Sequence, residues 1–115
     1  MKRNTAQLKE QLIQIGIEEI GKHGIEQLSL RTVAKACGVT HGSPYRHFES
    51  KEGYLKVVLG QLSQFLNQEI NQSIDATTSA REQLTQLGLN FIIFARTYPH
   101  FFEALFIKFP FKYMK

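Results

Sequence analysis

The chain has few of the features that mark secreted or membrane proteins. Its 115 residues include a single cysteine, Cys37, so no disulfide can form within the chain, as is usual in a reducing compartment. No run of about 18 apolar residues occurs, so no membrane-spanning helix is expected. The basic start, Met1–Asn4, is followed by Glu10, Glu18 and Glu19 rather than by an apolar signal region. These absences predict a soluble, cytoplasmic protein.

The sequence also lacks the spacings that hold metal ions. Neither Cys-x-x-Cys nor His-x-x-x-His occurs, and although His41 and His47 are near Cys37, that cysteine falls on an apolar stripe and is expected to be buried. Ser43, His47 and Glu49 could be imagined as nucleophile, base and orienting carboxylate. A short exposed helix, however, neither excludes water nor binds an oxyanion. We therefore expect no metal, no cofactor and no enzymatic activity.

The charge that is present is unevenly distributed. The net charge is +4, and residues 1–56 hold nine Lys and Arg against six Asp and Glu, whereas residues 57–115 hold five against four. A basic excess in the N-terminal half is typical of nucleic-acid binding, although many other proteins are equally basic. The 43% hydrophobic content is ordinary for a globular protein with a core of its own.

Helical periodicity occupies most of the chain, and no stretch alternates as a strand does. An amphipathic stripe predicts a helix over 5–22, ended by Gly21 and Gly24. Ser29 and Thr40 are expected to cap two short helices, the second through about His47, with Gly38 between them in a left-handed conformation. The fold is therefore predicted to be all-α.

The second half is expected to form longer helices. Ser50 should cap a helix of roughly 24 residues, and Ser79 with Glu82 should form a capping box that opens another helix. Pro99 can begin a last short helix through Phe106. The apolar residues expected to face inward on the helix after Ser79 are Leu84, Leu87, Phe91, Ile92 and Ala95.

Residues 29–48 have the layout of a helix-turn-helix. Such a motif needs a short helix, a tight turn that usually contains glycine, and a second helix that crosses the first closely. Ala34 permits the close approach, and the packing residues are expected to be Leu30, Val33, Cys37, Val39 and Phe48. The exposed face is expected to hold Thr40, His41, Ser43, Tyr45, Arg46 and His47, which suit base edges and phosphates. Spacing alone equally allows two packed helices with a polar outside.

The stretch from Ile25 to Leu59 closely resembles the DNA-binding domain of the tetracycline-repressor (TetR) family of bacterial regulators. The resemblance rests on Gly24, Ser29, the run from Arg31 to Thr40, the run Tyr45-Arg46-His47-Phe48, and Ser50-Lys51-Glu52 before Leu55. It implies a helix-turn-helix domain over 1–50, with the motif at 29–48. It also implies the start of a helical ligand-binding and dimerisation domain over 51–115. The segment from Tyr98 to Phe106 resembles part of the ligand domain of one TetR subgroup.

The resemblance assigns DNA contacts residue by residue. Thr40, His41 and Ser43 would face bases, and Gly42 would let the backbone approach closely. Arg31 would reach a base edge or a phosphate.

Phosphate contacts are implied for the residues around the motif. Ser29, Tyr45, His47 and Lys51 would hold phosphates, and Arg46 would contact phosphate or remain solvated. The sequence departs from the family at Pro44, where many members carry leucine. A proline is tolerated in a first turn, but one apolar anchor would be lost.

The C-terminal part is rich in aromatic side chains. From Tyr98 to Tyr113, seven of sixteen residues are aromatic. Phe91, Phe94, Phe102 and Phe106 are expected to be bundle core, or alternatively the wall of a pocket for an apolar or aromatic inducer. Family members usually continue for several helices, the last two forming the dimer interface, so the bundle is expected to be incomplete.

Together these features predict a ligand-responsive repressor that binds a pseudo-palindromic operator as a homodimer. The alternative is a truncated interaction module that pairs with a full-length regulator and blocks its DNA binding. A basic amphipathic membrane-surface protein is disfavoured, because the aromatic and basic residues do not share one helix.

Overall fold

Helices make up most of the described chain. The structure is a computed structural model that describes residues 4–108, and this range contains no β-strand. The elements are α1 (Thr5–His23), the 3₁₀ turn η1 (Ile25–Gln27), α2 (Leu30–Ala36), α3 (Ser43–Phe48), α4 (Lys51–Asn71), α5 (Ala80–Thr97), α6 (Pro99–Glu103) and the π-helical turn η2 (Ala104–Lys108). The predicted all-α fold is confirmed. The end of the aromatic-rich segment, 109–113, lies outside the described residues.

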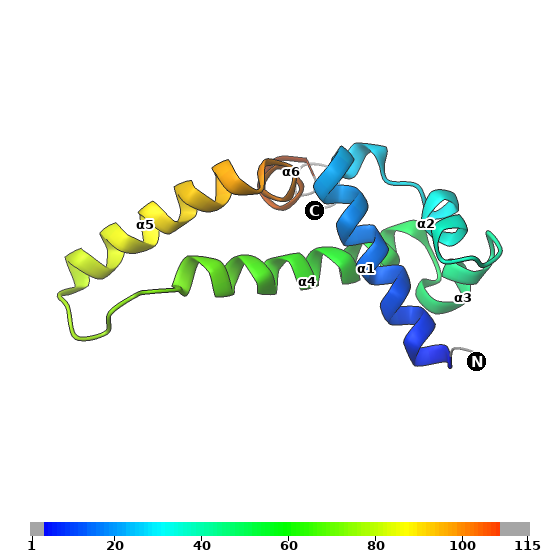
Figure 1. The fold of residues 1–115 in the computed structure, drawn as a ribbon, viewed down its shortest axis with the longest axis horizontal. Helices are drawn as coiled ribbons and strands as arrows, with labels where there is room; N and C mark the ends of the chain where they lie inside the picture. Colours follow the sequence, from blue (N-terminus) through cyan, green and yellow to red (C-terminus); the bar gives the residue numbers. More distant parts are fainter. Residues whose placement is uncertain (1–3, 109–115) are drawn as a thin grey trace.

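The elements form a cluster at one end and a long arm. Figure 1 shows α1, α2 and α3 gathered around the start of α4, which then extends away from them. After a turn at the far end, α5 runs back along α4 and leads into α6, which packs against α1. The molecule measures 53 × 34 × 25 Å. α4 ends at Asn71, a few residues earlier than the sequence predicts.

Local caps determine where most helices begin. The hydroxyl oxygens of Ser29, Ser50 and Ser79 each accept a hydrogen bond from the backbone N–H three residues later, as predicted. At Ser79 the structure shows this half of the predicted capping box. α1 ends at His23 and is capped by Gly24, whose φ of 87° suits a residue without a Cβ, whereas Gly21 lies within the helix.

One buried core holds the cluster together and includes the C-terminal segment. Ala104 in η2 is fully buried and belongs to one core cluster with buried residues of α1, α2, α3 and α4, and Phe101 packs on the same core. The ring of Phe101 lies where Gly21 of α1 leaves room. Lys108 Nζ lies 3.4 Å from a carboxylate oxygen of Glu26, within η1. The core therefore crosses the domain boundary near residue 50 that the sequence suggests, and α6 and η2 pack against α1 and α4.

Tyr54 fixes α4 against α1. Its side chain is fully buried, and its hydroxyl donates a 2.6 Å hydrogen bond to the carbonyl oxygen of Leu12. Burial raises the pKa of the Tyr54 hydroxyl above its ordinary value, which keeps it neutral. A Cβ at Gly16 would collide with this hydroxyl, so the glycine makes room for it. Phe48, at the end of α3, packs edge-on against the same ring at 5.0 Å.

The inward face predicted for α5 is partly wrong. Leu84 and Ile92 are 69% and 59% exposed, whereas Phe94, which was not assigned to this stripe, is 2% exposed. Within the described residues α5 packs along α4 on one side only, and its contact face includes the polar side chain of Asn90. Apolar periodicity cannot identify a packing face when apolar residues occupy both sides of the helix.

Candidate nucleic-acid interface

α2 and α3 form a helix-turn-helix whose inner residues are buried. Val33 and Ala34 of α2 are 0% and 1% exposed. α2 is followed by Gly38 with a φ of 73°, as predicted, and the Val39 N–H donates to the Ala34 carbonyl oxygen at 3.0 Å. The predicted packing of the motif is therefore present.

The second helix begins later than the sequence suggests. α3 starts at Ser43 with Gly42 at its N-cap, so Thr40 does not cap it through its side chain. Instead, the Thr40 carbonyl oxygen accepts a hydrogen bond from the Ser43 N–H at 3.1 Å. Pro44 explains the difference. A helix capped by Thr40 would place this proline at the first position whose N–H must bond within the helix, and proline has none.

Most of the predicted contact residues are exposed, and one is not. Ser43 is only 8% exposed, so its assignment to the exposed face is wrong. The first residue of α3 faces α1, and Ser43 lines a hollow there. Pro44 is also fully buried, so it acts as an apolar anchor in the place of the leucine whose loss was expected.

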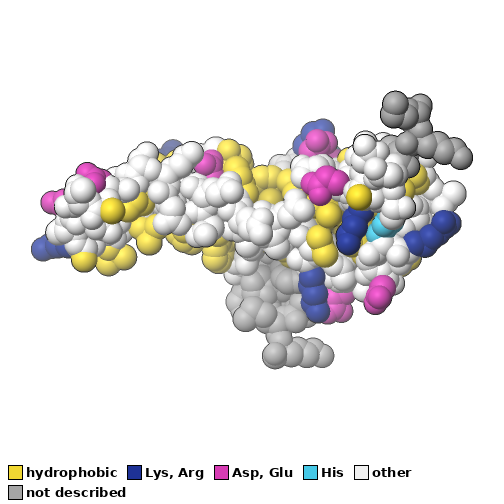
Figure 2. All heavy atoms as spheres, turned by 90° about the horizontal axis from the view of Figure 1, so that it is seen from below, with side chains coloured by type: hydrophobic (Ala, Val, Ile, Leu, Met, Phe, Trp, Pro, Cys, Tyr) yellow, Lys and Arg dark blue, Asp and Glu magenta, His cyan; other side chains and the backbone are white. Residues whose placement is uncertain are grey.

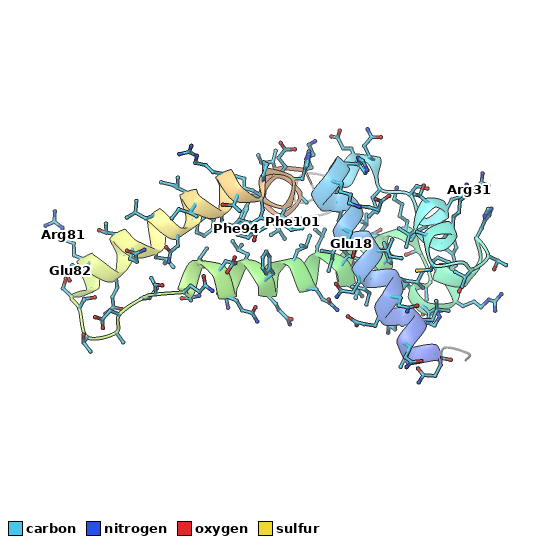
Figure 3. The ribbon with its side chains drawn as sticks, viewed as in Figure 1. Glu18, Arg31, Arg81, Glu82, Phe94 and Phe101 are labelled. Carbon is cyan, nitrogen blue, oxygen red and sulfur yellow. The ribbon has the colours of Figure 1, made fainter. Side chains whose placement is uncertain are left out.

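The remaining predicted residues lie on or beside the motif. Thr40, His41 and Gly42 lie in the turn before α3 rather than on the helix. The exposed residues are Arg31, Thr40, His41, Gly42, Tyr45, Arg46 and Lys51, while Ser29 and His47 are partly buried. Arg31 projects outward from α2 (Figure 3). In Figure 2, basic and histidine side chains lie over this end of the molecule, together with acidic ones.

The start of α4 holds Lys51 next to the motif. Glu49 takes a φ of 67° in the tight turn after α3, and Ser50 caps α4 through the Gly53 N–H. A Cβ at Gly53 would collide with the carbonyl oxygen of Phe48, so this glycine allows α3 and α4 to meet closely. The sequence signal for both Gly16 and Gly53 is a glycine inside an otherwise good helix, which usually marks close packing.

The four phenylalanines predicted as core or pocket fall into two groups: Phe94 lies in one aromatic cluster, and Phe91, Phe102 and Phe106 lie in another. Phe94 packs against the rings of Phe65 and Tyr98, with centroids 6.0 and 5.2 Å apart. Phe106 lies 5.4 Å from Phe91 and 5.0 Å from Phe102, and it is 41% exposed. The buried position of Phe94 agrees with the core interpretation for that residue.

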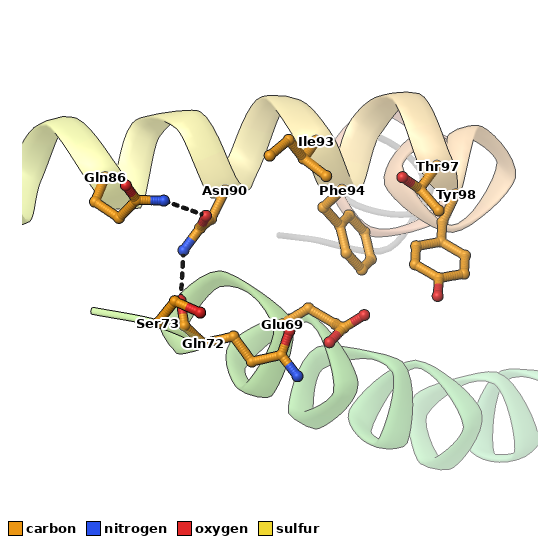
Figure 4. A pocket seen from close by; sticks show the side chains of 9 residues that line it. All are labelled: Glu69, Gln72, Ser73, Gln86, Asn90, Ile93, Phe94, Thr97 and Tyr98. Carbon is orange, nitrogen blue, oxygen red and sulfur yellow. Dashed lines mark hydrogen bonds between the residues drawn. The ribbon is translucent and has the colours of Figure 1, made fainter. Parts of the chain in front are cut away.

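A hollow of about 210 Å³ lies between α4 and α5 near their ends (Figure 4). Phe94 is among the residues that line this hollow, whereas Phe91, Phe102 and Phe106 are not. Its other lining residues are mainly polar, and Asn90 is bound on both sides: it accepts from Gln86 Nε2 at 2.8 Å and donates to the carbonyl oxygens of Ile70 and Gln72. Among residues 4–108, no three His, Cys, Asp or Glu side chains gather as a metal site. None of the helices in that range has the length and hydrophobicity to cross a membrane.

Comparison with known proteins identifies the architecture. Residues 12–58, from the middle of α1 into α4, match the model of the family described as bacterial regulatory proteins, tetR family. The chain belongs to this family. The segment that matches the TetR family contains the helix-turn-helix, Lys51 and Tyr54, so the family suggested by the sequence motifs is confirmed.

Relatives within the TetR family match beyond this segment. The chain is 32% identical over 82 residues to the transcriptional repressor KstR2 of Mycolicibacterium smegmatis, covering 71% of this chain and 40% of that protein. It is 26% identical over 99 residues to the nucleoid occlusion factor SlmA of Haemophilus ducreyi, covering 85% and 49%. The chain thus spans less than half the length of these two relatives. A solved TetR-family regulator from Haemophilus influenzae has the same fold, with a TM-score of 0.61 and 21% identity over 99% of this chain and 66% of that one.

Proposed function

We propose that the chain is a cytoplasmic DNA-binding transcriptional regulator that represses its target genes. The observation that carries this proposal is a helix-turn-helix with a buried interior and an exposed, cationic and hydrogen-bonding outer side, within a segment that matches the TetR family. Repression is supported by two relatives that are named as repressors, the transcriptional repressor KstR2 and a probable acrEF/envCD operon repressor of Escherichia coli.

In the proposed complex, the start of α3 enters the major groove. The turn residues Thr40, His41 and Gly42 precede α3, and this N-terminal end is the part of a recognition helix that contacts base edges. Arg31 would reach a base or phosphate from α2. Arg46 and Lys51, both exposed, would contact phosphates on either side. Ser29, Tyr45 and His47 would add hydrogen bonds to the backbone.

A second copy of the chain would complete the operator complex. Each copy would read one half-site of a pseudo-palindrome. α4 is the natural connection between ligand and DNA, because it contacts α1 and α3 at one end and α5 along the other. A small apolar or aromatic inducer would release DNA only if it bound the DNA-incompetent arrangement more tightly. The hollow of about 210 Å³ is below the ~300–1,000 Å³ typical of drug-sized ligands, so a larger inducer needs further protein to complete the site.

A mobility shift with the DNA upstream of the gene tests the proposal. The expected result is a retarded complex with this duplex that survives an excess of random duplex. Because specific sites are typically bound ~10³–10⁷ times more tightly than random DNA, the difference should be large. Equal competition by the two duplexes would contradict sequence-specific binding.

One observation favours a second candidate, an interaction module that pairs with a full-length regulator. α5 leaves four large apolar side chains between 49% and 69% exposed, those of Leu84, Leu89, Ile92 and Ile93. A helix that is apolar on both sides is usually covered on both. Sedimentation with and without a palindromic duplex separates the candidates, because an interaction module stays off the DNA.

A further inference from the structure

A hollow lies where the start of α1 meets α3. Its volume is about 320 Å³, and its lining residues are Asn4, Thr5, Leu8, Ser43, Arg46 and His47. None of these side chains carries a carboxylate, whereas one is a guanidinium and one is an imidazole. The hollow is therefore suited to an anion.

The N-terminus of α1 offers unused hydrogen-bond donors at this hollow. The capping box uses the N–H groups of Asn4 and Gln7, and the Leu8 N–H donates to the Asn4 carbonyl oxygen. The N–H groups of Thr5 and Ala6, at the first two helical positions, have no partner inside a helix. α1 is 19 residues long, so its N-terminus also carries a partial positive charge of about half a unit.

Ser43 supplies an independent sign that the hollow binds something. The residue is 8% exposed, yet its hydroxyl makes no hydrogen bond to any of the described residues. Its backbone N–H already donates a hydrogen bond to the Thr40 carbonyl oxygen. The hydroxyl is therefore open to the hollow and available to a hydrogen-bonding ligand there, within a residue that is otherwise buried.

We propose that this hollow holds one phosphate of the DNA backbone. Arg46 would pair with the phosphate through charge, while the Thr5 N–H and the Ser43 hydroxyl would donate hydrogen bonds to its oxygens. α1 thereby becomes a third element of the DNA interface beside α2–α3 and the start of α4. Ser43 would position the protein rather than read a base, because phosphate contacts carry no sequence information. This inference rests on the proposed DNA binding.

Two variants remove donors from the hollow while preserving the fold. Thr5→Pro deletes the N–H at the first helical position, where proline is tolerated, and the extended backbone of Asn4 is compatible with a following proline. Ala80→Pro is its matched control, since it makes the same change at the first position of α5, at the far end of the molecule. Ser43→Ala deletes the hydroxyl, and Ser63→Ala on the exposed side of α4 is its control.

The test measures the affinity of the full chain for a random-sequence 20-base-pair duplex by fluorescence anisotropy. Thr5→Pro and Ser43→Ala should each weaken binding about ten-fold, as expected for the loss of a hydrogen bond to a charged group, and the two controls should not. A selection from randomised duplexes should return the wild-type preference for both variants. In the wild type, the Thr5 and Ala6 amide signals should shift in NMR spectra when the duplex is added, which tests the site even if a variant misfolds.

Four results would overturn the site. If Thr5→Pro and Ser43→Ala both bind duplex with wild-type affinity while Lys51→Ala binds more weakly, the phosphate site is refuted but the proposed function is not. An altered sequence preference in Ser43→Ala shows that Ser43 reads a base. If millimolar inorganic phosphate shifts the Thr5 amide while duplex leaves it unmoved, the hollow is a site for the free anion. A wild-type chain that binds no duplex refutes the proposed function and this inference with it.

Discussion

Replacing Tyr54 by phenylalanine should lower stability at neutral pH and remove a specific sensitivity to alkali. The lost group is a fully buried hydroxyl that donates to the Leu12 carbonyl oxygen at 2.6 Å. That oxygen also lies within α1 and keeps its helical partner, so the expected loss is that of an ordinary hydrogen bond, about 1 kcal/mol. At pH 7 the wild type should therefore have the larger free energy of unfolding.

The pH dependence follows from the raised pKa of Tyr54 in the folded state. A raised pKa contributes stability that is present below the unfolded pKa of about 10 and is lost as the pH rises above it. Above this pH the free energy of unfolding of the wild type falls by up to about 1.4 kcal/mol per pH unit. The wild type's advantage of about 1 kcal/mol over Tyr54→Phe should therefore disappear between roughly pH 10.5 and 11. Other alkaline titrations are shared by both proteins and cancel in the comparison.

Urea unfolding followed by circular dichroism, at steps from pH 7 to 11, measures both effects. The two stability curves should converge and cross near the upper end of this range. Curves that stay parallel throughout would refute a buried, neutral Tyr54 as the link between α1 and α4.

Three further predictions concern DNA binding. Lys51→Ala should weaken binding to specific and random duplex alike and should reduce the slope of log K against log salt by about one unit per domain; unchanged affinity for both would show a merely solvated lysine. Tyr45→Phe should cost about ten- to hundred-fold in affinity without changing the melting temperature, because the residue is 49% exposed and its hydroxyl is proposed to bond a phosphate. His41→Ala should flatten one or two positions per half-site in a randomised-duplex selection, whereas Ala34→Leu, at a 1% exposed position, should abolish all binding by forcing α2 and α3 apart. An unchanged selection with His41→Ala would move the reading role to Arg31.

The features that were predictable from the sequence are those decided by neighbouring residues. Ser29, Ser50 and Ser79 each cap a helix through a donor three residues away, and Gly38 takes the left-handed backbone expected of it. The family motif could be recognised for the same reason, since its residues are close together in the chain.

The features that were missed depend on contacts that are distant in sequence. Ser43 faces α1, more than thirty residues earlier, so a helical wheel of α3 alone places it on the wrong side. The buried face of α5 is set by α4, and apolar periodicity wrongly placed the exposed residues Leu84 and Ile92 on that face. Ala104 joins the core formed by α1, α2, α3 and α4 because α5 returns the chain to α1, which no local pattern reveals.

The central claim is that this helix-turn-helix docks on duplex DNA through several phosphates. The most direct test is the salt dependence of binding by the full chain to the duplex upstream of its gene, measured between about 50 and 200 mM salt. If each domain neutralises about four phosphates, a dimer should give a slope of log K against log salt near −7. A slope shallower than about −2 would contradict this docking.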